Sequence, residues 1–121
     1  MTPDDSVIAQ IEKRLKSATG RLHQLAAAVG HAKQVREFAG DRKKNLLAKY
    51  VVRALKAGET STAAETIGRA DPSYQSDLEA LASDSEQAET VIAQWSAEMA
   101  SFEAARSLLS MQKESLRLLE G

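Results

Sequence analysis

The stretch IAQIEKRLKSATGRLHQLAAAVGHA, residues 8–32, decides the fold class, because apolar residues recur in it at alternating intervals of three and four. The recurring positions are Ile8, Ile11, Leu15, Ala18, Leu22, Leu25, Val29 and Ala32. This spacing places all of them on one stripe of an α-helix, as in a coiled coil. The sequence therefore predicts a long amphipathic helix that buries this stripe against another helix.

The predicted first helix covers residues 3–57. Thr2 is the predicted N-cap, and Pro3 suits the first helical position, where its missing N–H costs nothing. Gly58 is the predicted stop signal, because glycine is common just beyond a helix C-terminus.

The apolar stripe changes register within this helix. The spacing would next select Arg36 and Lys43, whereas Val35 and Phe38 continue the stripe one position earlier. This pattern predicts a register shift or a small break near Gly40. Gly40 is also the third glycine in a ten-residue spacing that starts at Gly20. Such glycines are either tolerated within a long helix or allow a neighbouring subunit to approach closely.

A connector is predicted over residues 58–71. Thr62 and Glu65 match a capping box, which predicts a short helix that ends near Gly68.

The predicted second long helix covers residues 72–120, with Asp71 as its N-cap and Pro72 at its first position. A second seam lies on this helix at Leu78, Leu81, Ser85, Ala88, Ile92, Trp95, Met99 and Phe102. Two long helices joined by a short connector predict an all-α fold, a long antiparallel hairpin of coiled-coil type. A hairpin buries only one seam, so the remaining apolar residues predict a homo-oligomer.

Composition excludes several classes of protein. The chain has 121 residues and 43% hydrophobic residues, which is a globular value and suits one domain over residues 1–121. It has no cysteine, so disulfides, thiolate metal sites and a cysteine nucleophile are excluded. No apolar run approaches the roughly 20 residues of a membrane span, and the first residues do not resemble a secretory signal. We expect a soluble cytoplasmic protein with no membrane partner.

The net charge of -1 hides a strong asymmetry. Residues 1–58 hold twelve Lys and Arg against five Asp and Glu, whereas residues 59–121 hold four against twelve. A chain polarised in this way has either two halves that pair electrostatically or separate binding surfaces.

The basic charge is concentrated between Lys33 and Lys56, where eight basic residues stand against two acidic ones. At about 100° per residue, four of them fall within about 60° of one another on a helix. These four are Arg42, Lys49, Arg53 and Lys56. Such a stripe suits the phosphates of a nucleic acid, and Tyr50 lies near enough to stack on a base. The alternative is that the stripe pairs with acidic residues of the second helix, namely Asp84, Glu86 or Glu89.

No motif for catalysis or for a cofactor occurs in the sequence. His23 and His31 lie eight residues apart without a carboxylate at ligand spacing. There is no G-x-S-x-G motif, no glycine-rich phosphate loop and no E-x-x-H motif. We expect no metal, no cofactor and no enzymatic activity.

Two segments resemble bacteriophage recombination-mediator proteins of the UvsY type, over roughly residues 36–119. One is RKKNLLAKY, residues 42–50, which continues to a glycine turn at Gly58 and resembles the basic helix of that family. The other is the long amphipathic helix Leu78–Leu119 with Trp95 at its middle, which is similar to the family's oligomerisation helix. The resemblance implies an all-helical oligomer that binds single-stranded DNA and helps to load a recombinase onto strands covered by single-strand-binding protein.

The resemblance places Lys49 and Arg53 at the centre of the DNA contacts. The predicted nucleic-acid-binding residues are Arg42, Lys43, Lys44, Lys49, Tyr50, Arg53 and Lys56. The predicted self-association residues are Trp95, Phe102, Leu108, Leu109, Leu116 and Leu119. Our first hypothesis is an oligomeric single-stranded-DNA-binding accessory protein of recombination or replication. The alternative is a coiled-coil structural, adaptor or inhibitor protein that acts through protein contacts alone.

Overall fold

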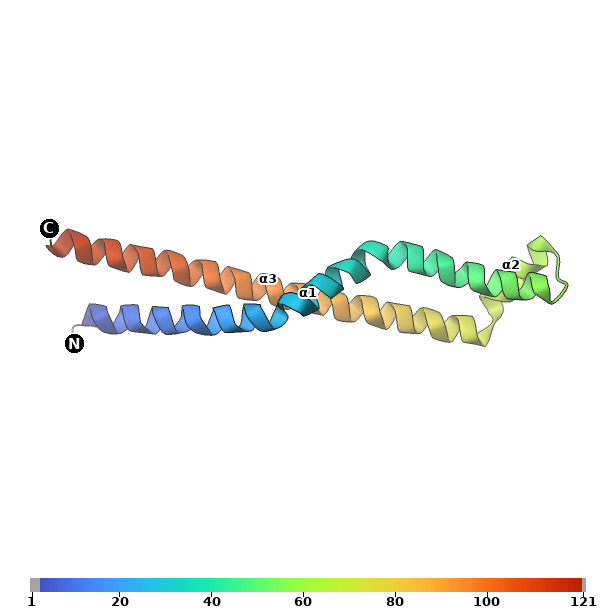
Figure 1. The fold of residues 1–121 in the computed structure, drawn as a ribbon, viewed down its shortest axis with the longest axis horizontal. Coiled ribbons are helices and arrows are strands. Elements are labelled where there is room, and N and C mark those ends of the chain that lie inside the picture. The colour runs from blue at the N-terminus through green and yellow to red at the C-terminus, as the bar shows by residue number, and fades with distance from the viewer. Residues whose placement is uncertain (1–2, 121) are drawn as a thin grey trace. The chain divides into compact units, whose positions relative to one another are not determined.

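The computed structural model describes residues 3–120 and consists of three helices (Figure 1). Helix α1 covers Pro3–Lys56, α2 covers Ser61–Ala70 and α3 covers Pro72–Glu120. No strand occurs among these residues, so the predicted all-α class is confirmed. The predicted N-cap Thr2 lies outside the described residues.

Helix α1 ends at Lys56 and is followed by a Schellman motif with Gly58 in the left-handed position. The φ of Gly58 is +97°, a left-handed value that glycine adopts without the penalty of a side chain. Its N–H donates to the carbonyl oxygen of Leu55 at 3.0 Å, and the N–H of Glu59 donates to that of Ala54 at 3.2 Å. These two bonds satisfy carbonyl groups that the end of a helix leaves free. The predicted stop signal is confirmed.

The N-cap of α2 is Thr60, so the predicted capping box at Thr62 is wrong. The side-chain oxygen of Thr60 accepts a hydrogen bond from the N–H of Ala63 at 3.3 Å. Thr62 lies within the helix, and Glu65 pairs with Arg69 at 3.0 Å instead of returning to a cap. Threonine at either position could cap a helix. The extended backbone of Thr60 determines which one does.

The N-cap predicted for α3 is confirmed. The side chain of Asp71 accepts a hydrogen bond from the N–H of Ser73 at 2.8 Å, and its carbonyl oxygen accepts one from Gln75 at 3.1 Å. Pro72 occupies the first helical position, as its fixed φ favours.

Helix α1 continues without interruption through Gly40, so the break predicted there does not occur. Val35 is buried, as the shifted register predicts, but the side chain of Phe38 is 48% exposed. The half-buried Ala39 and Leu46 continue the inner stripe instead. The inner stripe therefore departs from the strict spacing at Val35 and again at Ala54, which is buried in place of Arg53. The 3.6-residue turn absorbs this drift without a break.

The chain divides into two compact units, and the first contains residues up to Val29 together with those from Val91 onward. Here the first part of α1 packs against the last part of α3. The buried hydrophobic residues of this unit are Ile11, Ala18, Val29 and Ala105. Arg21 Nε donates to Glu98 Oε1 at 2.7 Å and joins the two helices across the unit.

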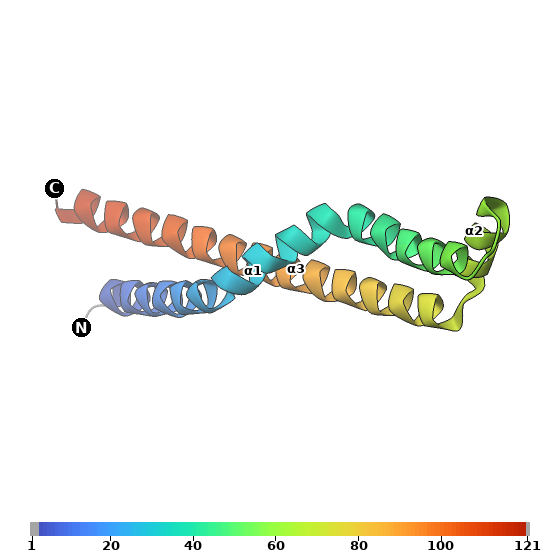
Figure 2. The same ribbon diagram turned by 45° about the vertical axis from the view of Figure 1, so that its right-hand side comes forward.

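The second unit is Gly30–Thr90. In two views its parts of α1 and α3 lie side by side, with α2 at the chain reversal (Figures 1 and 2). These parts are antiparallel, because Arg36 bonds to Glu89 while Tyr50 bonds to Asp77. The buried hydrophobic residues are Ala32, Val35, Tyr50, Ala54, Ala64, Tyr74 and Ala88. None of the described helices is long and apolar enough to cross a membrane.

Gly68 allows α2 to pack directly on the backbone of α1. A Cβ atom at this position would lie 3.3 Å from the carbonyl carbon of Tyr50 and 3.3 Å from the amide nitrogen of Val51. These atoms belong to a helix backbone and cannot move as a flexible side chain does. A Cβ atom at Gly40 would meet no atom within 4 Å.

We therefore expect alanine to have opposite effects at these two glycines. Gly40→Ala should raise the free energy of unfolding by about 1 kcal/mol, because alanine is the better helix former. Gly68→Ala should lower it by about 1 kcal/mol, since overpacking of about 1–3 kcal/mol exceeds the same gain. Urea denaturation followed by circular dichroism measures both changes. A Gly68→Ala variant as stable as the wild type would show that α2 is not held against α1. Loss of self-association in Gly40→Ala would favour a close subunit approach there.

Candidate nucleic-acid interface

Four basic residues form the cationic stripe of the second unit. They are Arg42, Lys49, Arg53 and Lys56 of α1, and all four are exposed. The inner side of the same helix segment carries the buried Tyr50 and the half-buried Leu46 and Leu47. The four cations stay exposed in the structure, although Leu46 lies only about 20° from Arg53 around the helix.

The acidic residues of α3 do not neutralise the cationic stripe in the structure. Among residues 6–120, no stripe residue has a nitrogen within 4.0 Å of a carboxylate oxygen. Glu89, one of the three expected partners, instead accepts from Arg36 Nε at 2.7 Å and from Nη2 at 2.5 Å. These hydrogen bonds lower the pKa of the Glu89 carboxyl. The described ion pairs likewise include neither Asp84 nor Glu86.

Tyr50 is buried, so the prediction that it stacks on a base is wrong. Only 4% of the residue is exposed, and its hydroxyl donates to Asp77 Oδ2 at 2.5 Å. The ring packs edge-on against Tyr74 with a centroid distance of 5.5 Å. Tyr50 follows Leu46 by four residues, and this spacing already places it on the inner face of the helix. Its ring has no face left for a base.

Tyr50 nevertheless contacts two residues of the cationic stripe through the face of its ring. The guanidinium carbon of Arg53 lies 4.8 Å from the centroid of the Tyr50 ring, and Lys49 Nζ lies 5.8 Å from it. Cation–π contacts of this kind hold a basic side chain against the helix while its charge stays exposed. The inner residue thus positions the two central cations of the stripe.

The hydrogen bond to the Asp77 carboxylate raises the pKa of the Tyr50 hydroxyl, and burial raises it further. A raised tyrosine pKa means that the folded state favours the neutral hydroxyl. Its contribution to stability is therefore complete below about pH 10, the pKa of an unfolded tyrosine. It is lost as the pH rises through the folded value.

We expect Tyr50→Phe to remove this alkaline loss of stability. The difference in unfolding free energy between wild type and variant should be constant from about pH 6 to 9 and should shrink above about pH 10. Urea denaturation at each pH measures it. Tyr74→Phe keeps the Tyr50–Asp77 bond, so it should keep the wild-type decline. A Tyr50→Phe variant with the same alkaline decline as the wild type would contradict the assignment.

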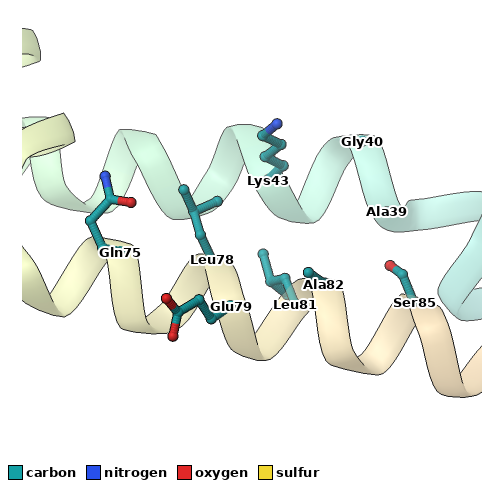
Figure 3. Close-up of a pocket in the computed structure, with 9 residues that line it drawn as sticks. All are labelled: Ala39, Gly40, Lys43, Gln75, Leu78, Glu79, Leu81, Ala82 and Ser85. Atoms are coloured by element: carbon teal, nitrogen blue, oxygen red, sulfur yellow. The ribbon is translucent and has the colours of Figure 1, made fainter.

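Lys43 and Lys44 are exposed but do not belong to the cationic stripe. At about 100° per residue they lie about 120° and 140° from Lys49 around the helix. Lys43 borders a groove of about 550 Å³ between α1 and α3 in the second unit. Figure 3 shows its amine pointing away from α3, while Leu78 points toward α1. The structure thus unites four of the six predicted cations on one face.

The predicted self-association residues differ in exposure. Trp95, Phe102, Leu109 and Leu116 are half-buried in the first unit, and the first two belong to the second seam. Leu108 is 39% exposed and Leu119 is 78% exposed. Met111 and Leu118, which the predicted set omits, are 64% and 71% exposed. The last turns of α3 therefore present an apolar surface that no described residue covers.

Comparison with known proteins adds nothing to the description of the site. No family model, no curated protein and no solved structure matches the chain. In the part of the chain that the structure describes, no three His, Asp or Glu side chains are grouped so as to hold a metal ion.

Proposed function

We propose that this protein is a non-enzymatic, oligomeric accessory protein that binds single-stranded DNA and assists recombination or replication. The observation that carries the proposal is the exposed cationic stripe on α1, which forms no ion pair with residues 6–120. An exposed row of cations releases the counterions condensed on a phosphate backbone when it binds, and this release supplies affinity without reading sequence.

The dimensions of the cationic stripe suit a strand of nucleic acid. Arg42 and Lys56 are fourteen residues apart on one helix, which corresponds to about 21 Å at 1.5 Å per residue. A row of this length can follow several successive phosphates. The protein reads no base edge through these contacts, so binding should tolerate any sequence.

The proposed protein is an oligomer of helical hairpins. In each copy, α1 and α3 form one long antiparallel hairpin, and copies associate through the exposed apolar end of α3. An oligomer presents several cationic stripes to one strand, and binding of the second stripe is then effectively intramolecular. The resemblance to UvsY-type mediators supports a role in loading a recombinase onto strands covered by single-strand-binding protein.

Fluorescence anisotropy of labelled oligonucleotides tests the proposal. Four phosphate contacts on a single strand predict that log K falls with log salt with a slope of about -3, and an oligomer that engages several stripes steepens it. Oligonucleotides of unrelated sequence should bind alike. Undetectable binding at about 50 mM salt, where such contacts are strong, would refute the proposal.

A second candidate is a coiled-coil structural, adaptor or inhibitor protein that uses protein contacts alone. The exposed apolar side chains at the end of α3 favour it, because such a surface serves any protein partner equally well. This candidate predicts self-association or partner binding without any affinity for nucleic acid. The anisotropy measurement therefore distinguishes the two functions.

A further inference from the structure

Phe38 differs from the other aromatic residues because its side chain is exposed. Of the five aromatic side chains, only that of Phe38 is exposed, at 48%. Tyr50 and Tyr74 are buried, and the other two are half-buried. About half of the Phe38 side chain therefore faces solvent, where it is available to a ligand.

Phe38 lies on the same face of α1 as the cationic stripe. At about 100° per residue it is within about 40° of Arg42, Lys49 and Lys56. Positions 38, 42, 45, 49, 52 and 56 follow one another at intervals of four and three, which defines a straight outward row on the helix. All six members of this row are exposed.

The charges around Phe38 also differ from one side of the row to the other. Relative to Phe38, Arg42 and Arg53 lie on one side around the helix, whereas Glu37 and Asp41 lie on the other side. A phosphate backbone is attracted to the first side and repelled from the second. A strand held along the cations would therefore direct its bases across the row, where Phe38 stands.

We propose that Phe38 is the base-stacking residue of the single-stranded-DNA site. This inference rests on the proposed function and assigns to Phe38 the role that the buried Tyr50 cannot perform. Every base has a π-face, so stacking on a phenyl ring adds affinity without sequence preference. The bases of a duplex are stacked on one another and paired, so the same ring favours single strands over duplex DNA.

The outward row does not suit a membrane surface. An interfacial helix buries a broad apolar face beside a polar one. Between Phe38 and Lys56, the apolar members of the row are only Phe38 and Val52, and cations lie between them. One ring among cations suits a chain of alternating phosphates and bases.

The variant Phe38→Ala tests the inference by anisotropy. Its affinity for single-stranded DNA should fall about 5- to 150-fold, the range for one stacked base. The slope of log K against log salt should stay that of the wild type, because no phosphate contact is lost. With an oligonucleotide that lacks bases throughout, wild type and variant should bind alike. Leu55→Ala is the matched control, since Leu55 is 42% exposed on α1 but about 100° away from the row.

The outcomes distinguish failure of the stacking role from failure of the proposed function. Wild-type affinity in Phe38→Ala, with DNA binding by the wild type intact, overturns the stacking role and leaves the function standing. Absence of binding by the wild type overturns both. Equal losses on the normal and the base-free oligonucleotide would show that Phe38 acts through folding. Stronger binding to vesicles of anionic phospholipid than to DNA, weakened by Phe38→Ala, would assign the row to a membrane and also overturn the inference.

Discussion

Replacement of Lys49 and Arg53 by alanine should lower the affinity for single-stranded DNA about 60-fold at about 50 mM salt. Each cation that neutralises a phosphate contributes about 0.7 to the slope of log K against log salt. Two cations contribute about 1.4, which between about 1 M and about 50 mM salt corresponds to about 60-fold in affinity. The slope should change from about -3 to about -1.5, and the loss should be the same for all sequences. Anisotropy titrations at several salt concentrations measure both quantities.

Two control variants separate loss of contacts from loss of structure or of overall charge. Lys13 and Lys16 are exposed residues of α1 in the first unit, and replacing both by alanine removes the same charge. That variant should retain most of the affinity. Arg42→Gln with Lys56→Gln removes two stripe charges without touching the Tyr50 ring, and it should repeat the loss. Equal losses in all three variants would show that net charge, and not the cationic stripe, governs binding.

Replacement of both Leu118 and Leu119 by glutamate should dissociate the oligomer. These side chains are 71% and 78% exposed in the single chain, so self-association would bury them. Burial of a leucine contributes at least about 1.5 kcal/mol, and a two-fold dimer buries four of them. The dissociation constant should therefore rise about 10,000-fold or more. Sedimentation equilibrium measures it directly.

The matched control places the same charges on the polar positions of this region. Ser110 and Ser115 are exposed on α3, and replacing both by glutamate changes the net charge equally. We expect that variant to remain an oligomer. A wild type that sediments as a monomer at micromolar concentration would contradict self-association and would weaken the resemblance to recombination mediators.

The helices themselves follow from local signals in the sequence. All eight positions of the first seam and all eight of the second are buried or half-buried, as the three-and-four spacing predicts. Gly58 and Asp71 mark the end of α1 and the start of α3, because cap geometry depends on residues close in sequence. Thr60 and Thr62 illustrate the limit of such signals. Both residues can cap a helix, and the backbone conformation selects between them.

Contacts between residues distant in sequence decide which side chains of the candidate site are exposed. The sequence by itself determined that α1 carries a stripe of cations and two aromatic residues, since composition and helical period suffice for that. Only the tertiary structure decided which aromatic residue is exposed. Asp77, 27 residues after Tyr50, accepts a hydrogen bond from the Tyr50 hydroxyl, and the ring of Tyr74 packs against that of Tyr50, whereas Phe38 is 48% exposed. The physical reason is that burial depends on the helix packed alongside, which the local pattern of one helix does not specify.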